Sequence, residues 1–176
     1  MKDNVVLTPP SPTQDANEPT SAERRANARA NPNYPPRRDY TLYKPNSRGI
    51  GAAVRFSVSR EKEAIFVEAA AQAGDRQFDW ENKIIMKWGL SDIGEVLAVL
   101  QDRQPSAKLF HQTAKGNSSC ELTTRDDPER APHMLAISRQ FAASGEVRKA
   151  VIPVTHAEAA VLDTALRAAI TRLLRW

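Results

Sequence analysis

The chain has 176 residues, the length of one ordinary domain or of one domain with a tail, so large multidomain enzymes are excluded. Lys and Arg outnumber Asp and Glu by 25 to 21, and this mild basic excess permits a nucleic-acid partner without requiring one. Cys120 is the only cysteine, which excludes an intrachain disulfide and disfavours a Cys-based zinc site. Without an apolar run of about 20 residues, the chain is expected to be soluble and to have no membrane partner.

Residues 1–39 are expected to form a disordered tail, and residues 40–176 a folded domain. Eight of the twelve prolines lie within the first 45 residues, and the tail has neither strand nor helix periodicity. It contains RRANAR and PPRR, whose arginines could contact phosphates, although we favour a solvated linker; the tail could also recruit a protein partner. Its acidic residues are unusual for a mitochondrial transit peptide, so import into an organelle is not expected.

From residue 40 the pattern changes to short alternating segments separated by turn residues, which is typical of antiparallel strands. Strands are expected at residues 40–44, 50–59, 64–71, 78–88, 107–113, 119–125, 133–141 and 147–154. Helices are expected after Ser91, which resembles an N-cap, and after Thr155, which begins a T-x-x-E capping box. Four strands and a helix thus occur twice, and the connections are too short for parallel crossovers. This order predicts an α+β fold of two antiparallel four-stranded sheets packed face to face, with both helices at one end.

Two of the expected strands alternate clearly between apolar and polar residues. In residues 50–59, Phe56 lies on the apolar side and Arg55 on the other. The apolar side of residues 78–88 holds Phe78, Trp80, Ile84, Met86 and Trp88. Of these apolar residues, Phe56, Ile84 and Met86 are expected to face the core.

No catalytic or cofactor motif is found in the sequence. The three histidines lie on different expected elements, and none has a metal-ligand spacing. RGIG at residues 48–51 lacks the helix that follows a phosphate-binding loop. Cys120 alternates with Leu122 and is expected to face the core. We therefore expect no enzyme activity, no metal and no cofactor.

Basic and aromatic residues lie beside one another along the expected strands. They are Tyr43, Lys44, Arg55, Phe56, Trp80, Lys83, Lys87, Trp88 and Lys108. Cationic groups neutralise phosphates and ring faces stack on unpaired bases of any identity, so this combination is typical of single-stranded nucleic-acid binding. Aromatic residues at alternate strand positions also build cores. We favour the core for Phe56 and leave both roles open for Trp80 and Trp88.

Three segments, in order along the chain, carry a family resemblance. DRQFDWENKIIMKWGLSDIGEVLAVL, at residues 75–100, joins an aromatic-Asp-Trp triplet to a helix with a serine cap. LFHQ follows at residues 109–112 and IPVTHAEAAVLDTAL at residues 152–166. Each segment resembles the corresponding block of the Whirly family of single-stranded-DNA-binding proteins, and Trp176 falls where family members end in Gly-Trp. The resemblance covers residues 40–176.

The resemblance implies crosswise-packed sheets with a helical kernel, four protomers around a fourfold axis, and single-stranded DNA bound between the sheets of neighbouring protomers. The family's Lys-Gly-Lys-Ala-Ala-Leu motif corresponds to GIGAAV at residues 49–54, where both lysines are absent. Arg48 and Arg55 could replace part of that charge, while higher assembly of tetramers stays open. Together with the composition of the tail, the missing lysines suggest a bacterial or phage-type member in the cytoplasm of the bacterial cell or infected host.

We therefore predict a non-enzymatic homotetramer that binds single-stranded DNA with little sequence specificity and supports DNA replication, recombination or repair. An alternative is a transcription regulator that binds promoter DNA through the same fold. A third hypothesis, a structural or adaptor protein that recruits a partner through its tail, predicts no affinity for nucleic acid.

Overall fold

The computed structural model describes residues 39–126 and 129–176. The predicted tail at residues 1–39 lies outside this part except for Asp39, so the tail and its boundary with the folded domain remain predictions. Within the described part, the strands form two antiparallel sheets, each followed by a helix.

The first sheet has the order β1-β2-β3-β5, and the two-residue strand β4 pairs with the end of β3. Its strands are β1 (Tyr40–Lys44), β2 (Ala52–Ser59), β3 (Ala64–Gly74), β4 (Gln77–Phe78) and β5 (Ile84–Trp88). The second sheet has the order β6-β7-β8-β9. Its strands are β6 (Ser106–Thr113), β7 (Gly116–Thr124), β8 (His133–Phe141) and β9 (Val147–Val154). Helix α2 (Leu90–Leu100) follows β5 and helix α3 (His156–Leu174) follows β9, which confirms the predicted α+β fold and its repeated order.

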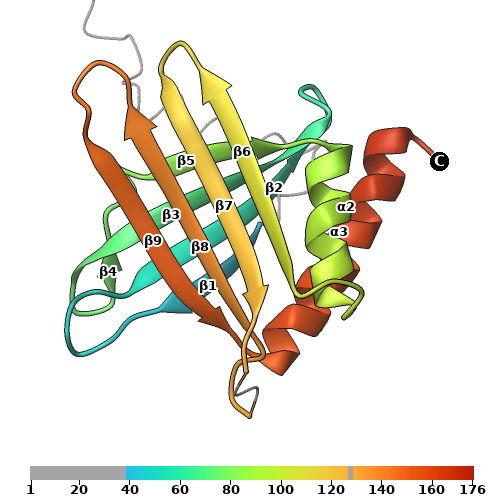
Figure 1. Cartoon of the computed structure of the whole chain (residues 1–176), viewed down its shortest axis with the longest axis horizontal. Coiled ribbons are helices and arrows are strands. Elements are labelled where there is room, and N and C mark those ends of the chain that lie inside the picture. The colour runs from blue at the N-terminus through green and yellow to red at the C-terminus, as the bar shows by residue number, and fades with distance from the viewer. Residues whose placement is uncertain (1–38, 127–128) are drawn as a thin grey trace, which may run out of the picture. The chain divides into compact units, whose positions relative to one another are not determined.

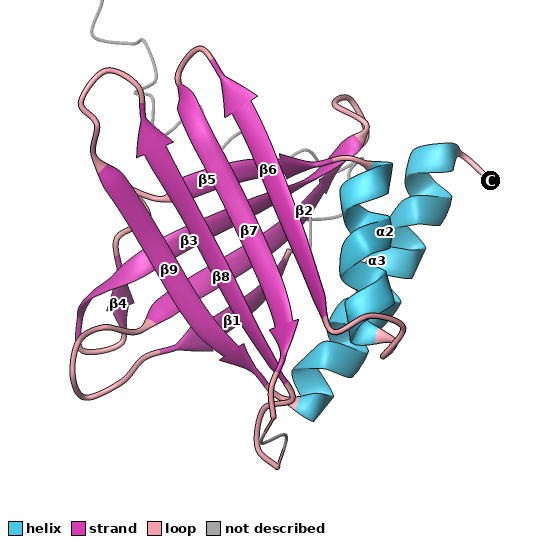
Figure 2. Cartoon of the chain, viewed as in Figure 1, coloured by secondary structure: helices cyan, strands magenta, loops and turns pink. Residues whose placement is uncertain are grey.

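The two sheets pack on each other with their strands running crosswise (Figure 1). Both helices lie along one side of the sheets, as expected, and strands and loops make up the rest of the described chain (Figure 2). α2 contacts β5 of the first sheet and β6 and β7 of the second, while α3 packs on α2 and reaches β1. The helices therefore tie the two sheets together along this side.

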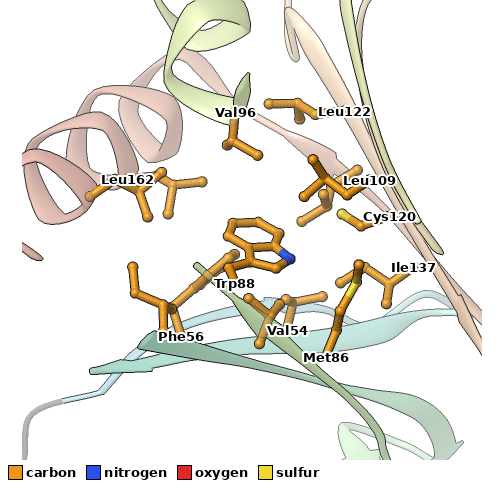
Figure 3. Packing of buried hydrophobic residues seen from close by; sticks show 14 of the residues in the cluster. Val54, Phe56, Met86, Trp88, Val96, Leu109, Cys120, Leu122, Ile137 and Leu162 are labelled. Atoms are coloured by element: carbon orange, nitrogen blue, oxygen red, sulfur yellow. The ribbon is translucent and has the colours of Figure 1, made fainter. Parts of the chain in front are cut away.

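One apolar core fills the space between the sheets and the helices (Figure 3). Trp88 lies at its centre with 0% of its surface exposed, and its ring centroid is 5.8 Å from that of Phe56. Successive side chains of a strand point to opposite faces, so alternate residues of each strand enter this core. As predicted, Ile84 and Met86 lie on the core face of β5 and Phe56 on the core face of β2; Trp88, whose role the sequence left open, shares the core face of β5.

The predicted single strand at residues 78–88 is wrong, because the chain turns between β4 and β5. The Asp79 carboxylate accepts hydrogen bonds from the backbone N–H of Asn82, at 3.0 Å, and from its side-chain amide, at 2.8 Å. Such an Asx bond closes a turn in place of a strand ladder. Trp80 therefore lies in this turn and does not share a strand with Trp88.

The predicted start of the first helix is displaced by two residues. Gly89, not Ser91, is the N-cap of α2, and its N–H donates to the Asp92 carboxylate at 2.9 Å. The capping box of α3 is confirmed, since the Thr155 N–H donates to Glu158 Oε2 at 2.9 Å and the Glu158 N–H donates to Thr155 Oγ1. Within residues 39–126 and 129–176, neither helix has the length and apolarity that a membrane span requires.

Cys120 faces the core from β7, as its alternation with Leu122 predicted. Burial, with smaller contributions from the charges of Asp92 and Glu121, raises the pKa of the thiol to about 12. The thiolate is the reactive form of cysteine, so this side chain acts as a small apolar group of the core.

The central place of Trp88 predicts a large loss of stability on truncation. Trp88→Ala removes a ring from a closely packed site and should lower the free energy of unfolding by about 3–5 kcal/mol in a denaturant titration. Trp176→Ala is the matched control, because that ring is 89% exposed and its loss should cost less than about 0.5 kcal/mol. Equal small effects of the two changes would contradict the core described for this fold.

Candidate nucleic-acid interface

The outward side chains of β1, β2, β3 and β5 form a surface on the side of the first sheet away from the core. We call this surface, together with residues 78–83 at its border, the outer face of the first sheet. Tyr43, Arg55 and Lys87 lie on it because each neighbours a buried residue along its strand. Trp80 and Lys83 join it through contacts with its side chains. Five of the predicted nucleic-acid-binding residues thus lie on one surface.

An aromatic pair covers one end of the outer face. The rings of Tyr43, on β1, and Phe78, on β4, have centroids 5.7 Å apart. β2 and β3 lie between these strands, so the rings meet above Ala53 and Ala70, which are both fully buried. Small side chains below thus let two rings lie close to the sheet, and Tyr43 remains 58% exposed to a ligand.

A charged cluster occupies the middle of the outer face. Strand register places Arg55 opposite Glu68, and the Arg55 Nε and Nη2 groups both donate to Glu68 Oε2, the Nε bond being 2.8 Å long. Lys83 Nζ lies 2.6 Å from Glu68 Oε1, so one carboxylate binds two cations. The Arg55 guanidinium also lies over the ring of Trp80, with its carbon 4.5 Å from the ring centroid, which is a cation–π contact.

The Glu68 carboxylate stays ionised despite its partial burial. Burial alone would raise its pKa, but the hydrogen bonds and charges of Lys83 and Arg55 outweigh burial and hold the pKa below its ordinary value. At neutral pH the cluster therefore carries two positive charges and one negative charge. Its net charge is positive, but lower than the count of basic residues suggests.

Lys87 and Arg48 differ from the cations of this cluster. Lys87 is exposed on the outer face of β5, opposite Phe66 of β3. Arg48 lies in the connection between β1 and β2, where its backbone N–H donates to the side chain of Asn46. Within the part of the chain that the structure describes, no acidic side chain pairs with either of these two cations.

Two predicted binding residues lie in the core. Phe56 and Trp88 point between the two sheets and are 6% and 0% exposed. Of the two roles left open for Trp88, the structure shows packing, and a ring enclosed on all sides offers no face to a base. The physical reason is strand parity, since both residues share the side of their strands that covers the core.

Lys44 and Lys108 also lie away from the outer face. Lys44, at the end of β1, points toward α3, and its Nζ lies 2.7 Å from Glu158 Oε1. Lys108 lies on the outward side of β6 in the second sheet, 3.2 Å from Glu121 Oε1. Lys44 points away from its neighbour Tyr43 because successive residues of a strand face opposite sides, whereas Lys108 lies on the other sheet.

The sequence analysis missed two contributors to the outer face. Phe78 was placed on the apolar side of one long strand, whereas it lies on β4 and packs against Tyr43. Glu68 was not considered at all. The hairpin itself contained the signal for Glu68, because a turn at residues 60–63 pairs Ser59 with Ala64 and, four steps on, Arg55 with Glu68.

Histidines and acids do not gather elsewhere into a metal centre. Among residues 39–126 and 129–176, no group of three or more His, Cys, Asp and Glu side chains could hold a metal ion. His111 Nε2 lies 3.1 Å from Asp92 Oδ1 and so links β6 to the start of α2. His133 is buried, and burial lowers its pKa, which favours the neutral ring.

Comparison with known proteins gives a family and several relatives. The family model described as "Whirly transcription factor" matches residues 46–165. The single-stranded DNA-binding protein WHY1, chloroplastic, of Solanum tuberosum is 30% identical over 126 residues, which cover 69% of this chain and 45% of that protein. The protein of the same name in Arabidopsis thaliana is 27% identical over 64% of this chain. The chain thus matches less than half the length of these relatives.

Solved structures share the fold at lower identity. The plant transcriptional regulator PBF-2 has a TM-score of 0.65 and 23% identity, over 80% of this chain and 84% of the other. The Trypanosoma MRP1/MRP2 structure has a TM-score of 0.58 and 14% identity, over 88% of this chain and 94% of the other. Both therefore share the fold of this chain.

The comparisons correct the expected source and location of the protein. The relatives are plant proteins named as chloroplastic, which contradicts a cytoplasmic location and gives no support to a bacterial or phage origin. Acidic residues in the tail argued only against one type of transit peptide. The lysines missing from residues 49–54 described a local difference in one motif and not the origin of the chain.

Proposed function

The chain belongs to the Whirly family, and we propose that it binds single-stranded DNA with little sequence preference. Relatives that match more than three fifths of this chain are named single-stranded DNA-binding proteins. The observation that carries the proposal is the outer face of the first sheet, which places exposed rings and cations on one surface.

The chemistry of this surface fits an unpaired strand better than a duplex. Tyr43 and Trp80 offer ring faces or edges on which bases of any identity can stack, and unpaired bases expose those faces. Lys87, Arg55 and Lys83 lie on the same surface and can neutralise phosphates without reading sequence. Arg48, at the end of the sheet, can extend the path. A duplex would offer the phosphates but would keep its base faces stacked inside.

The location is proposed from the relatives, which are named as chloroplastic, and the biological role from the proposed binding of single strands. We place the protein in an organelle, where it would support DNA replication, recombination or repair. An alternative is a transcription regulator, which is favoured by the description of the matching family and by the plant regulator that shares the fold. The alternative requires a preference for particular sequences, so the two roles differ in a measurable property.

We also propose that the chain assembles as a homotetramer through its helices. Val161 on α3 is 49% exposed and Leu90 at the start of α2 is 41% exposed, although each belongs to an otherwise packed helix. Exposed apolar side chains on the same side of a molecule often mark an interface, and symmetric oligomers are the usual outcome. This arrangement would leave the outer face of the first sheet to DNA.

The DNA-binding proposal predicts a preference for single strands. Fluorescence anisotropy with a labelled oligo-dT should give a lower Kd than a duplex of equal length. The affinity should fall with log salt by about 0.7 per phosphate contact, so about four contacts give a slope near −3. Tighter binding of the duplex would reject the proposal. A preference of more than about 2 kcal/mol among single-stranded sequences would favour the transcription regulator.

The assembly proposal predicts a tetramer in solution. Light scattering at micromolar concentration should give four times the 19.5 kDa mass of one chain. Val161→Lys should shift the mass toward monomer because it places a charge in the proposed interface. Val147→Lys is the matched control, since that side chain is 62% exposed on β9, and it should leave the mass unchanged. A monomer mass for the unmodified chain would refute the tetramer.

A further inference from the structure

Among the residues that the structure describes, Glu68 is the acidic side chain that pairs with cations on the outer face of the first sheet. We infer that Glu68 competes with DNA phosphates for Arg55 and Lys83, and so limits the affinity of this surface for single-stranded DNA. The inference rests on the proposed function and identifies a residue that weakens DNA binding. It predicts that removal of an acidic side chain strengthens binding.

The geometry of Glu68 uses both of its oxygens. Oε2 accepts from the Arg55 guanidinium, and Oε1 lies 2.6 Å from Lys83 Nζ. The Glu68 side chain is 15% exposed, whereas those of Arg55 and Lys83 are 27% and 26% exposed. The acid therefore lies beneath its partners, and a phosphate could reach the outward parts of both cations only in competition with a carboxylate already in place.

The ionisation of Glu68 keeps this competition active at neutral pH. Its two cations hold the carboxyl pKa below the ordinary value, so protonation does not release them under physiological conditions. A phosphate that approaches Arg55 or Lys83 therefore meets a fixed negative charge of the same sign as its own. Like charges disfavour each other, and less solvent between them strengthens the repulsion.

Lys87 provides the contrast on the same sheet. In the described part of the chain it has no acidic partner, so its whole charge is available to a phosphate. Lys83 lies near the other end of β5, and its charge is partly offset by Glu68, which it shares with Arg55. Lys83 and Lys87 should therefore contribute unequally to DNA binding, although the sequence alone gives no reason to expect different contributions from them.

The alternative is that Glu68 helps DNA binding, because its bonds would hold Arg55 in the position that DNA needs. The contact of Arg55 with Trp80 holds the guanidinium independently, at 4.5 Å from the ring centroid. Glu68→Gln keeps the length of the side chain and one oxygen acceptor for Arg55, and it removes only the charge. This substitution therefore separates a positioning role, which it largely preserves, from an electrostatic one, which it abolishes.

The test measures the affinity of the full chain for oligo-dT by fluorescence anisotropy at 50–200 mM salt. Single-strand binding depends strongly on salt over this range. If Glu68→Gln frees one phosphate contact, affinity should rise at every salt concentration, the rise should be about 2.6-fold larger at 50 mM than at 200 mM, and the slope should steepen by about 0.7. Glu61→Gln is the matched control. It removes the same charge from an exposed pair with Lys62 in the β2–β3 turn, and it should change affinity less than twofold, about the size expected for a distant screened charge.

A second pair of variants keeps the test decisive if Glu68→Gln folds poorly by circular dichroism. Lys87→Gln should weaken binding more than Lys83→Gln, because Glu68 offsets part of the Lys83 charge and none of the Lys87 charge. Equal or lower affinity of a folded Glu68→Gln, or a larger effect at Lys83 than at Lys87, would overturn the inference while leaving the proposed function intact. Failure of the unmodified chain to bind oligo-dT would defeat both.

Discussion

The packing of Trp88 between two crossed sheets determines which side chains of the first sheet can meet a ligand. Successive side chains of a strand point to opposite faces, so a fixed core face fixes an outer face. Trp88, Met86 and Ile84 fill the core from β5, which turns Lys87 outward. The same parity on β2 buries Phe56 and exposes Arg55. The candidate interface is therefore a consequence of the core.

The packing of the core leaves a buried polar atom of Trp88 without a hydrogen bond in the part of the chain that the structure describes. Within the described residues, the indole Nε1 of Trp88 is buried and has no hydrogen-bond partner. An unpaired buried donor typically costs about 1–3 kcal/mol, which the apolar contacts of so large a ring offset. The outer face needs no comparable packing, so it can hold rings and charges that a ligand would cover.

Much of the fold could be predicted from the sequence because it depends on local periodicity. The alternation in residues 84–88 and the capping box at Thr155 follow from the residues themselves, and both are present. The turn at Asp79 was missed because its residues also fit a strand pattern, whereas the Asp79 carboxylate accepts two hydrogen bonds from Asn82 in a turn. This turn separates Trp80 from Trp88, whose roles the sequence left open.

The composition of the site was harder to predict than its location. Basic residues can be counted in a sequence, but their partners depend on register and on contacts between distant segments. The Arg55–Glu68 pair follows from the symmetry of the hairpin and can be predicted from the sequence. The Lys44–Glu158 pair joins residues far apart in the chain and cannot. The charge that DNA would meet is thus a property of the fold.

The central claim is that DNA meets the outer face of the first sheet and leaves the core undisturbed. Nuclear magnetic resonance of the indole N–H groups tests it directly, because Trp80, Trp88 and Trp176 each give a separate signal that single Trp→Phe changes assign. On addition of oligo-dT, the Trp80 signal should shift or broaden while the Trp88 signal stays in place. A Trp80 signal that does not respond to saturating oligo-dT would contradict the account.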